Sequence, residues 1–240
     1  MQKFQQMVEK KDSRINLLER EQEVIKLLIL FLEQDLDFIV VGGYAISTYK
    51  KRFSVDLDIV VREKDLEKFF KLLEEGDYSL HYEKNIDLLY GEDFKRFVKK
   101  IKNLPVSIDL LINGVVSRTT NATWSFDYVK KHSVKRKLNN IEFLMPEKEL
   151  LISMKFHSGR LSDIRDVVAL MPCDKGKLKQ HLLKGDTKKL KQLMKKQAAF
   201  LDKPQFDDSF KGIFGVHVYN EKDVQTAKKL IGDLLREIKD

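Results

Sequence analysis

The sequence predicts an α/β protein whose strands lie in the N-terminal part and whose C-terminal region is mainly helical. Three apolar runs, residues 38–41, 54–61 and 106–112, have the length and composition of buried strands. The segments between them carry apolar residues at helical spacing, and beyond residue 172 the chain is lysine-rich with the same spacing. Strands that alternate with helical segments are typical of a sheet covered by helices.

Length and composition favour a soluble globular protein. The chain has 240 residues, enough for one large domain or a core with a helical appendage, and 42% of them are hydrophobic and 34% charged. No apolar run reaches the ~18 residues that a membrane span needs, and the first residues lack an apolar signal core. The single cysteine, Cys173, excludes an internal disulfide and fits a reducing cytoplasm, where we expect the protein. The net charge of +8 is compatible with nucleotide phosphates or nucleic acid as partners.

The N-terminal elements follow from the spacing of apolar side chains. Residues 1–36 predict a helix whose charged first part is an exposed arm or a partner contact and whose second part packs on the sheet. The strand at 38–41 ends in two glycines, and a helix is expected over residues 43–50. After the second strand, Asp65 is a good N-cap for a helix that ends near residue 75.

The rest of the chain predicts further helices, a third strand and a hairpin. Residues 92–102 place four apolar side chains at helical spacing and predict a basic helix before the third strand. Residues 114–121 have the composition of a loop, and Asn139-Asn140 that of a two-residue hairpin turn. Residues 202–212 are expected to form a loop.

Two carboxylates on the second strand are the most informative feature. Side chains alternate between the faces of a strand, so Asp56 and Asp58 share one face while Leu57 and Ile59 share the other. Two neighbouring carboxylates in a strand suited to burial repel each other and lose hydration. A divalent cation with a preference for oxygen ligands, such as Mg²⁺, is the usual compensation. A solvated edge strand is the alternative interpretation of the pair alone.

The glycine pair supplies a second, weaker signal. Gly42 and Gly43 follow one strand and precede a helix, where backbone N–H groups can approach a phosphate closely. A Gly-Gly pair alone is most often only a turn. Its position about a dozen residues before the two aspartates favours a combined metal and phosphate site.

A third carboxylate lies in the third strand. Val106, Ile108 and Leu110 take one face of this strand and leave Asp109 on the other, an unusual place for a charged residue in an apolar run. Either Asp109 joins the first two carboxylates, or it is a strand-end residue held by backbone donors.

These residues resemble the signature of the nucleotidyltransferase superfamily with a DNA-polymerase-β-like palm, in its minimal or abortive-infection-type branch. The first motif matches at Gly42, Gly43, Tyr44, Ala45, Arg52, Ser54, Asp56 and Asp58. The downstream motif of that branch matches at Lys155, Gly159, Arg160, Asp163, Asp166 and Val167. Taken alone, this second segment is a charged helix with internal ion pairs. Two departures are Lys50, where such spacers often have Gly, and Gly43, where polymerase-like members often have Ser.

The resemblance implies a nucleotidyltransferase fold, with a small mixed sheet flanked by helices, and a set of roles. Asp56, Asp58 and Asp109 would be catalytic and would hold Mg²⁺ or Mn²⁺, with Asp109 also helping to activate the acceptor. The implied nucleotide-binding residues are Gly42, Gly43, Arg52, Ser54, Lys155, Arg160, Asp163 and Asp166. Within this set, Lys155 would face phosphate, and Asp163 or Asp166 would orient it or neighbouring groups.

Two functional hypotheses follow from the resemblance. In the first, the protein is an enzyme that transfers a nucleoside monophosphate from an NTP to an acceptor hydroxyl and releases pyrophosphate. The acceptor would be an RNA or tRNA end, a protein or a small molecule, and the basic segments favour RNA. In the second, it is a non-catalytic nucleotide- or RNA-binding module, or the toxin of a toxin–antitoxin pair with an antitoxin partner. We expect a core at residues 1–145 with its helical arm, and a helical region at 146–240 that completes the nucleotide site.

Overall fold

The computed structural model describes residues 2–81, 94–216 and 220–238, with side chains from Asn16 onward. The elements as far as the third long strand are α1 (Gln2–Glu33), β1 (Phe38–Val41), α2 (Gly42–Ser47), β2 (Asp56–Val61), α3 (Leu66–Glu75), β3 (Ser79–His81), β4 (Phe94–Ile101) and β5 (Leu104–Ile112). The second part begins with two hairpins and a short helix, β6 (Gly114–Ser117), β7 (Ala122–Ser125), α5 (Phe126–Lys131), β8 (Ser133–Leu138) and β9 (Ile141–Pro146). The remaining elements are helices, α6 (Lys148–His157), α7 (Ile164–Ala169), α8 (Lys175–Leu182), α9 (Thr187–Phe200), α10 (Pro204–Phe214) and α11 (Glu221–Glu237), with 3₁₀ turns at Glu63–Asp65 and Leu161–Asp163.

The central sheet is mixed, as the fold class predicts. Its strand order is β1-β2-β5-β4-β3. The neighbours β2 and β5 run parallel, and the other three pairs are antiparallel. The parallel pair stands in the middle of the sheet, so both of its strands are buried on at least one face.

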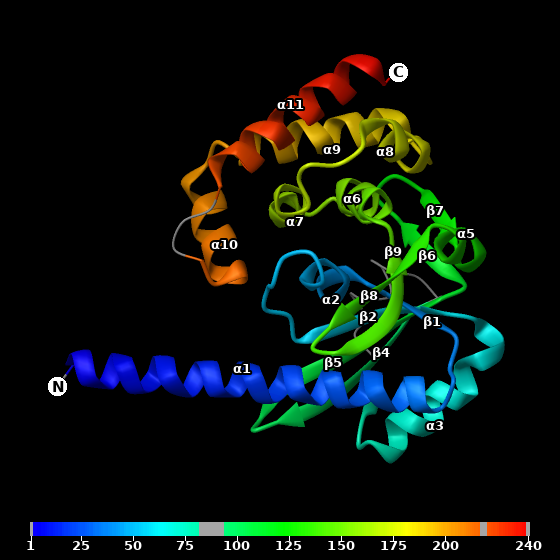
Figure 1. The fold of residues 1–240 in the computed structure, drawn as a ribbon, viewed down its shortest axis with the longest axis vertical. Helices are drawn as coiled ribbons and strands as arrows, with labels where there is room; N and C mark the ends of the chain where they lie inside the picture. The colour runs from blue at the N-terminus through cyan, green and yellow to red at the C-terminus, as the bar shows by residue number, and fades with distance from the viewer. Residues whose placement is uncertain (1, 82–93, 217–219, 239–240) are drawn as a thin grey trace.

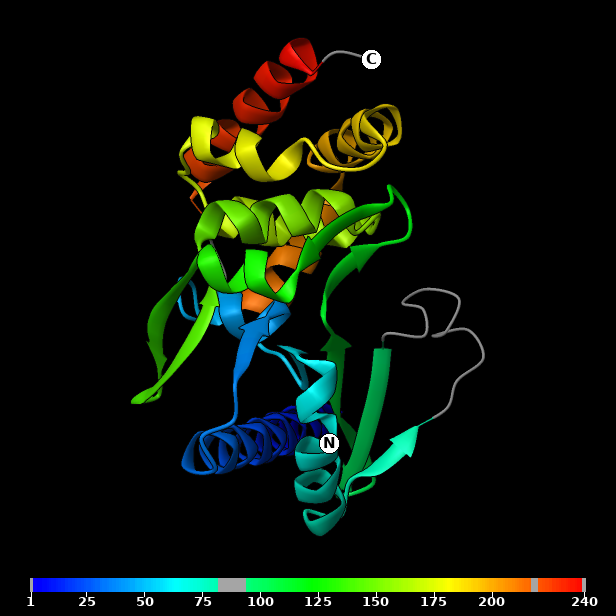
Figure 2. The same ribbon diagram turned by 90° about the vertical axis from the view of Figure 1, so that its right-hand side faces the viewer.

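Helices cover the sheet from two directions. α1 lies at one end of the molecule and the helices α6 to α11 gather at the other, with the sheet between them (Figures 1 and 2). Val24, Leu28 and Phe31 of α1 are fully buried. The ring of Phe31 packs edge-on against Phe69 of α3 at a centroid distance of 5.0 Å, a favourable aromatic geometry. No helix among the described residues is long and apolar enough to span a membrane.

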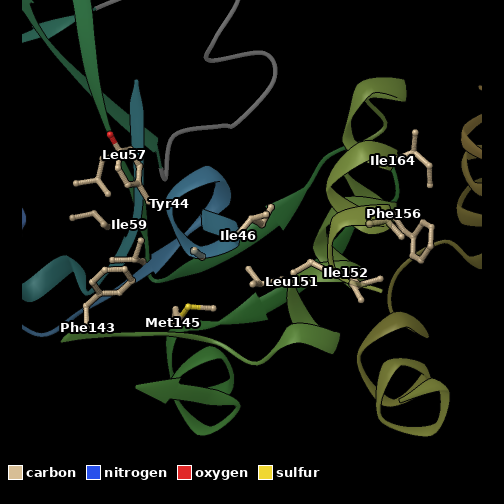
Figure 3. Close-up of a cluster of buried hydrophobic side chains, with 14 of the residues drawn as sticks. Tyr44, Ile46, Leu57, Ile59, Phe143, Met145, Leu151, Ile152, Phe156 and Ile164 are labelled. Carbon is tan, nitrogen blue, oxygen red and sulfur yellow. The ribbon is translucent and has the colours of Figure 1, made fainter. Parts of the chain in front are cut away.

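One core cluster joins the sheet to the C-terminal helices. Leu57 and Ile59 of β2 belong to the same cluster as Met145 of β9 and Leu151 and Ile152 of α6. Figure 3 shows these side chains together with Tyr44 and Ile46 of α2. The helical region therefore packs directly on the elements that carry the first motif.

Three segments differ from their sequence-based predictions. Residues 94–101 form strand β4 rather than a helix, because pairing with β3 and β5 on both sides outweighs the helical spacing of four apolar residues. Residues 114–117 and 122–125 form the β6–β7 hairpin where a loop was expected up to residue 121. Residues 204–214 form helix α10, whose rings Phe206, Phe210 and Phe214 are buried on one face at helical spacing.

Other predictions are confirmed. Asn139 and Asn140 both have positive φ, +47° and +67°, as a two-residue hairpin turn between β8 and β9 requires. Trp124, which the sequence favours as a core residue over a base-stacking platform, is 1% exposed. Residues 78–90 are compatible with one or two short strands; β3 is one of them, and residues 82–90 lie outside the described residues.

Candidate active site

Three carboxylates come together on one face of the sheet. β2 and β5 are parallel neighbours in a register that places Asp58 opposite Asp109 and Asp56 opposite Ser107. Paired residues on neighbouring strands point to the same face with backbones about 4.8 Å apart. The hydroxyl of Ser107 donates a hydrogen bond of 2.7 Å to Oδ1 of Asp56. The register of β2 and β5 therefore places the three carboxylates that the sequence singled out on the same face of the sheet.

The carboxylate face borders an apolar layer. Val60 of β2 and Leu111 of β5 share this face, and they belong to or pack against a second cluster that includes Trp124, Phe126 and Leu150. Asp109 is only 3% exposed and Asp58 is half-buried. Asp58 and Asp109 thus lie beside an apolar layer, which penalises their charged forms, whereas Asp56 is exposed.

Burial and mutual repulsion raise the pKa of two of these carboxyl groups. Burial, with the charge of Asp109 adding to it, raises the pKa of Asp58 to about 7, against the opposing effect of Lys155. Burial also raises the pKa of Asp109, although the Arg96 guanidinium acts to lower it. Such a set suits a divalent cation, whose positive charge offsets the repulsion and whose preferred ligands are carboxylate oxygens.

Arg96 is a site residue that the sequence did not predict. It stands opposite Asp109 in the β4–β5 register, and its Nε and Nη2 donate hydrogen bonds of 2.7 and 2.6 Å to the two oxygens of that carboxylate. This two-pronged pairing fixes the orientation of the carboxylate and offsets one negative charge. The sequence did not indicate Arg96 because residues 92–102 were predicted to form a helix, in which Arg96 would not stand opposite Asp109.

The glycine pair allows the chain to pass close to the site. Gly42 has a φ of +62°, and a Cβ atom added there would lie 1.9 Å from Oδ2 of Asp58. A Cβ on Gly43 would lie 2.4 Å from the hydroxyl of Ser54. Only glycine therefore lets the start of α2 lie against the Asp58 carboxylate and the loop before β2.

The loop between α2 and β2 is held by α10. The backbone N–H of Phe53 donates to the carbonyl of Ile213 at 2.8 Å. The ammonium of Lys50 lies 5.0 Å from the ring centre of Phe210 and 5.8 Å from that of Phe214, within cation–π range. Lys50 thus has a structural use at the position where the resembled family often has glycine.

The second motif forms a buried ion-pair network. The ammonium of Lys155 on α6 lies 2.8 Å from Oδ2 of Asp166 and 3.4 Å from Oδ1 of Asp163. Arg160 pairs with Asp163 at 3.1 Å. The other oxygen of Asp166 accepts a hydrogen bond of 2.7 Å from Nη1 of Arg52. Asp166 therefore links the first motif to the second.

The network favours the charged forms of Lys155 and Asp163. Burial acts to lower the pKa of Lys155, whereas the charges of Asp166 and Asp163 act to raise it. The net result is a pKa above the usual value for lysine. Burial acts to raise the pKa of Asp163, yet Lys155 and Arg160 hold it below its usual value. Lys155 is therefore a cation under all ordinary conditions.

The cations of the second motif act on the carboxylates of the first. The positive charges of Lys155 and Arg160 both act on the pKa of Asp58, which places them within electrostatic range of the carboxylates. Arg160 has a side chain that is 60% exposed, whereas Asp163 and Asp166 are buried beneath the two cations. The exposed end of the network thus presents the positive charge of Arg160. The buried carboxylates of Asp163 and Asp166 hold the cations in place.

The two motifs lie within one region of family similarity. Residues 16–201 match the family described as nucleotidyltransferase of unknown function, DUF6036. The chain belongs to this family. It is therefore a nucleotidyltransferase, and the matched region contains every carboxylate and cation described above. A comparison with curated proteins gives no match.

Solved structures agree with the nucleotidyltransferase fold. A proposed nucleotidyltransferase from H. pylori is 12% identical, with a TM-score of 0.51, and the alignment covers 92% of this chain and 95% of that one. At this identity the likeness establishes the fold alone. The lincosamide antibiotic adenylyltransferase LnuA is 16% identical over 62% of this chain and 95% of its own, with a TM-score of 0.46. The antibiotic-resistance factor ANT(2'')-Ia is 12% identical over 92% and 95%, with a TM-score of 0.43. Neither TM-score reaches 0.5, and no substrate is carried over from them.

Proposed function

We propose that this nucleotidyltransferase transfers a nucleoside monophosphate from an NTP to an acceptor hydroxyl in a reaction that depends on Mg²⁺. The acceptor oxygen forms a bond to the α-phosphorus, the bond from that phosphorus to the bridging oxygen breaks, and pyrophosphate leaves. The observation that carries the proposal is the pairing of Asp58 with Asp109 in adjacent parallel strands, directly beneath Gly42.

Asp56, Asp58 and Asp109 are the residues that would hold the cation. Their fit to Mg²⁺ is supported by the donor set, three carboxylates on one face, and by the raised pKa of Asp58. When bound, Mg²⁺ would offset charge on the triphosphate and on the attacking oxygen. Arg96 would then hold the Asp109 carboxylate in a fixed direction.

The chain's own residues have distinct parts in this proposal. Asp109, whose pKa is raised, accepts the proton of the acceptor hydroxyl. Lys155 and Arg160 offset the negative charge of the phosphates, and Asp163 and Asp166 keep these cations in position. Arg52, anchored on Asp166, fixes the loop that carries Ser54. On this account the helical region from residue 146 completes a site that the sheet begins.

The backbone at the start of α2 is the proposed seat of the triphosphate. Gly42 and Gly43 carry no side chain at the point where the chain passes closest to Asp58 and Ser54. The same freedom from side chains leaves the backbone N–H groups there accessible to phosphate oxygens.

Three cations of residues 130–137, one of the basic segments that favoured RNA as the acceptor, have partners within the chain. Lys130 pairs with Asp37 at 2.7 Å, Lys135 lies 3.8 Å from Glu142, and the guanidinium of Arg136 lies 4.2 Å from the ring centre of Tyr49. The positive charge of this segment therefore does not identify the acceptor class, which the experiment below distinguishes.

The test is incubation with each α-³²P-labelled NTP, Mg²⁺ and three acceptor pools, namely total tRNA, a protein extract and a set of hydroxyl-bearing small molecules that includes antibiotics. We expect label transfer to one pool, with pyrophosphate release, and its loss in Asp56→Ala and Asp58→Ala. The matched control is Asp208→Asn, a change at an exposed position of α10. Retained NTP binding without transfer to any pool would contradict the proposal and identify a binding module.

A further inference from the structure

Two histidines and a glutamate converge at a place the nucleotidyl chemistry does not use. His132 follows the last residue of α5, Glu147 precedes the first residue of α6, and His181 lies in α8. Nδ1 of His132 lies 3.3 Å from Oε1 of Glu147, and Nε2 of His181 lies 3.0 Å from the same oxygen. All three donor atoms lie within 4.8 Å of one another.

These distances suit a tetrahedral metal ion. Zinc binds histidine nitrogen and carboxylate oxygen at about 2.0–2.2 Å, so two ligand atoms of a tetrahedral site are about 3.3 Å apart. The two short distances in the cluster, 3.3 and 3.0 Å, have this size. Two imidazoles and one carboxylate form a borderline donor set, which suits zinc better than it suits Mg²⁺.

The surroundings of His181 are those of a metal ligand. Its ring is 1% exposed, and its second nitrogen, Nδ1, lies 2.8 Å from the hydroxyl of Tyr128. Metal-bound histidines are typically oriented by a hydrogen bond from the nitrogen that does not bind the metal. The carbonyl of His181 also accepts a hydrogen bond of 3.3 Å from the indole of Trp124, which fixes the backbone.

The other two ligands leave a way in from solvent. The side chains of His132 and Glu147 are 25% and 22% exposed. Their backbones are already joined, because the N–H of Glu147 donates to the carbonyl of His132 at 2.8 Å. An ion could therefore enter from the surface, bind the three side chains and keep a water as its fourth ligand.

Without a metal, the same contacts form a hydrogen-bonded cluster in which one carboxylate oxygen serves two imidazoles. That arrangement requires both nitrogens facing Glu147 to carry protons. A bound cation requires both to be bare, with Nδ1–H of His181 donating to Tyr128.

We propose that His132, Glu147 and His181 form a zinc site that clamps α5, α8 and the start of α6 together. The site lies outside the three carboxylates and does not depend on the nucleotidyl transfer proposed above. Its effect on that chemistry is indirect, since α6 carries Lys155. A clamp at the first turn of α6 holds the helix on which that cation stands.

The test measures zinc binding to the full chain after treatment with EDTA. Protein is titrated with Zn²⁺ against a chromophoric chelator in millimolar Mg²⁺, and Co²⁺ replaces Zn²⁺ for absorption spectra. We expect one ion per chain, a d–d absorption band of tetrahedral cobalt and a rise in melting temperature. His132→Asn should weaken binding at least tenfold, since loss even of an outer partner of a ligand typically costs 10–100-fold. His81→Asn, at an exposed histidine of β3, is the matched control and should bind as wild type does.

The choice of variants keeps the result decisive. His132 is partly exposed, so His132→Asn is expected to fold even where a change at buried His181 does not. Asp58→Asn should retain zinc binding, because the carboxylates of the sheet are not its ligands. The proposal is overturned by the absence of binding in wild type, by full binding in His132→Asn, or by loss of binding in Asp58→Asn.

Discussion

Asp58→Asn should stabilise the metal-free protein at pH 8 while it abolishes Mg²⁺ binding at the three carboxylates of the sheet. The pKa of Asp58 rises from 3.8 to about 7, because the native state buries the carboxylate beside Asp109. At pH 8 the native state must hold this charge, whereas the unfolded state solvates it freely. Each pKa unit corresponds to ~1.4 kcal/mol, so the full difference sets a ceiling of about 4 kcal/mol. The side chain keeps some solvent contact, and we expect a gain of about 1–2 kcal/mol.

The sign of this effect depends on pH. A carboxyl group with a raised native pKa favours folding below its unfolded value of 3.8, and this contribution is lost as the pH rises through about 7. The gain from Asp58→Asn should therefore be small at pH 4.5 and complete at pH 8.

The assay is urea unfolding in EDTA at both pH values, compared with wild type and with Asp208→Asn, an exposed position that should give no difference at either pH. A loss of stability in Asp58→Asn at pH 8, or a gain of equal size at pH 4.5, would refute the reasoning.

Three further predictions concern the neighbours of the carboxylates. Gly42→Ala should abolish Mn²⁺ binding, measured by electron paramagnetic resonance, and reduce the free energy of unfolding in urea by about 1–3 kcal/mol. The reason is that the alanine Cβ would meet the Asp58 carboxylate and that φ at this position is +62°. Wild-type Mn²⁺ binding in this variant would contradict the close approach of Gly42 to Asp58. Asp166→Ala should cost about 3–5 kcal/mol in urea unfolding, because it removes the carboxylate that pairs with both Arg52 and Lys155 and leaves buried Lys155 with Asp163 alone; a cost below 1 kcal/mol would show that the network relaxes freely. Arg96→Gln should raise the pKa of Asp109 further, since the guanidinium acts to lower it, and should move the rising limb of the pH–rate profile to higher pH; an unchanged profile would remove Asp109 from the proton-transfer role.

The three carboxylates can be predicted from the sequence because each stands out against its immediate neighbours in the chain. Alternation along a strand places Asp56 and Asp58 on one face, and the apolar neighbours of Asp109 single it out in the same way. Glycine at a position with positive φ is also a local feature, and Gly42 shows it. These residues could be found from the sequence because their role depends on their immediate neighbours.

The partners of these carboxylates are not local. Arg96 reaches Asp109 only through the register of β4 and β5, and apolar residues at 94, 97, 98 and 101 give β4 the spacing of a helix. Arg52 and Asp166 pair across 114 positions of the chain. No periodicity encodes such a contact, because it depends on how α7 packs against the loop before β2. The histidine cluster is hidden for the same reason, since its members come from three elements.

The most direct test of the central claim is a crystal structure with Mn²⁺ and a nonhydrolysable NTP, with the manganese located by anomalous scattering. The account predicts a peak within about 2.0–2.3 Å of carboxylate oxygens from both β2 and β5, and phosphate oxygens near Gly42. A structure in which manganese binds elsewhere, while Asp109 and Asp56 keep only their contacts with Arg96 and Ser107, would contradict it.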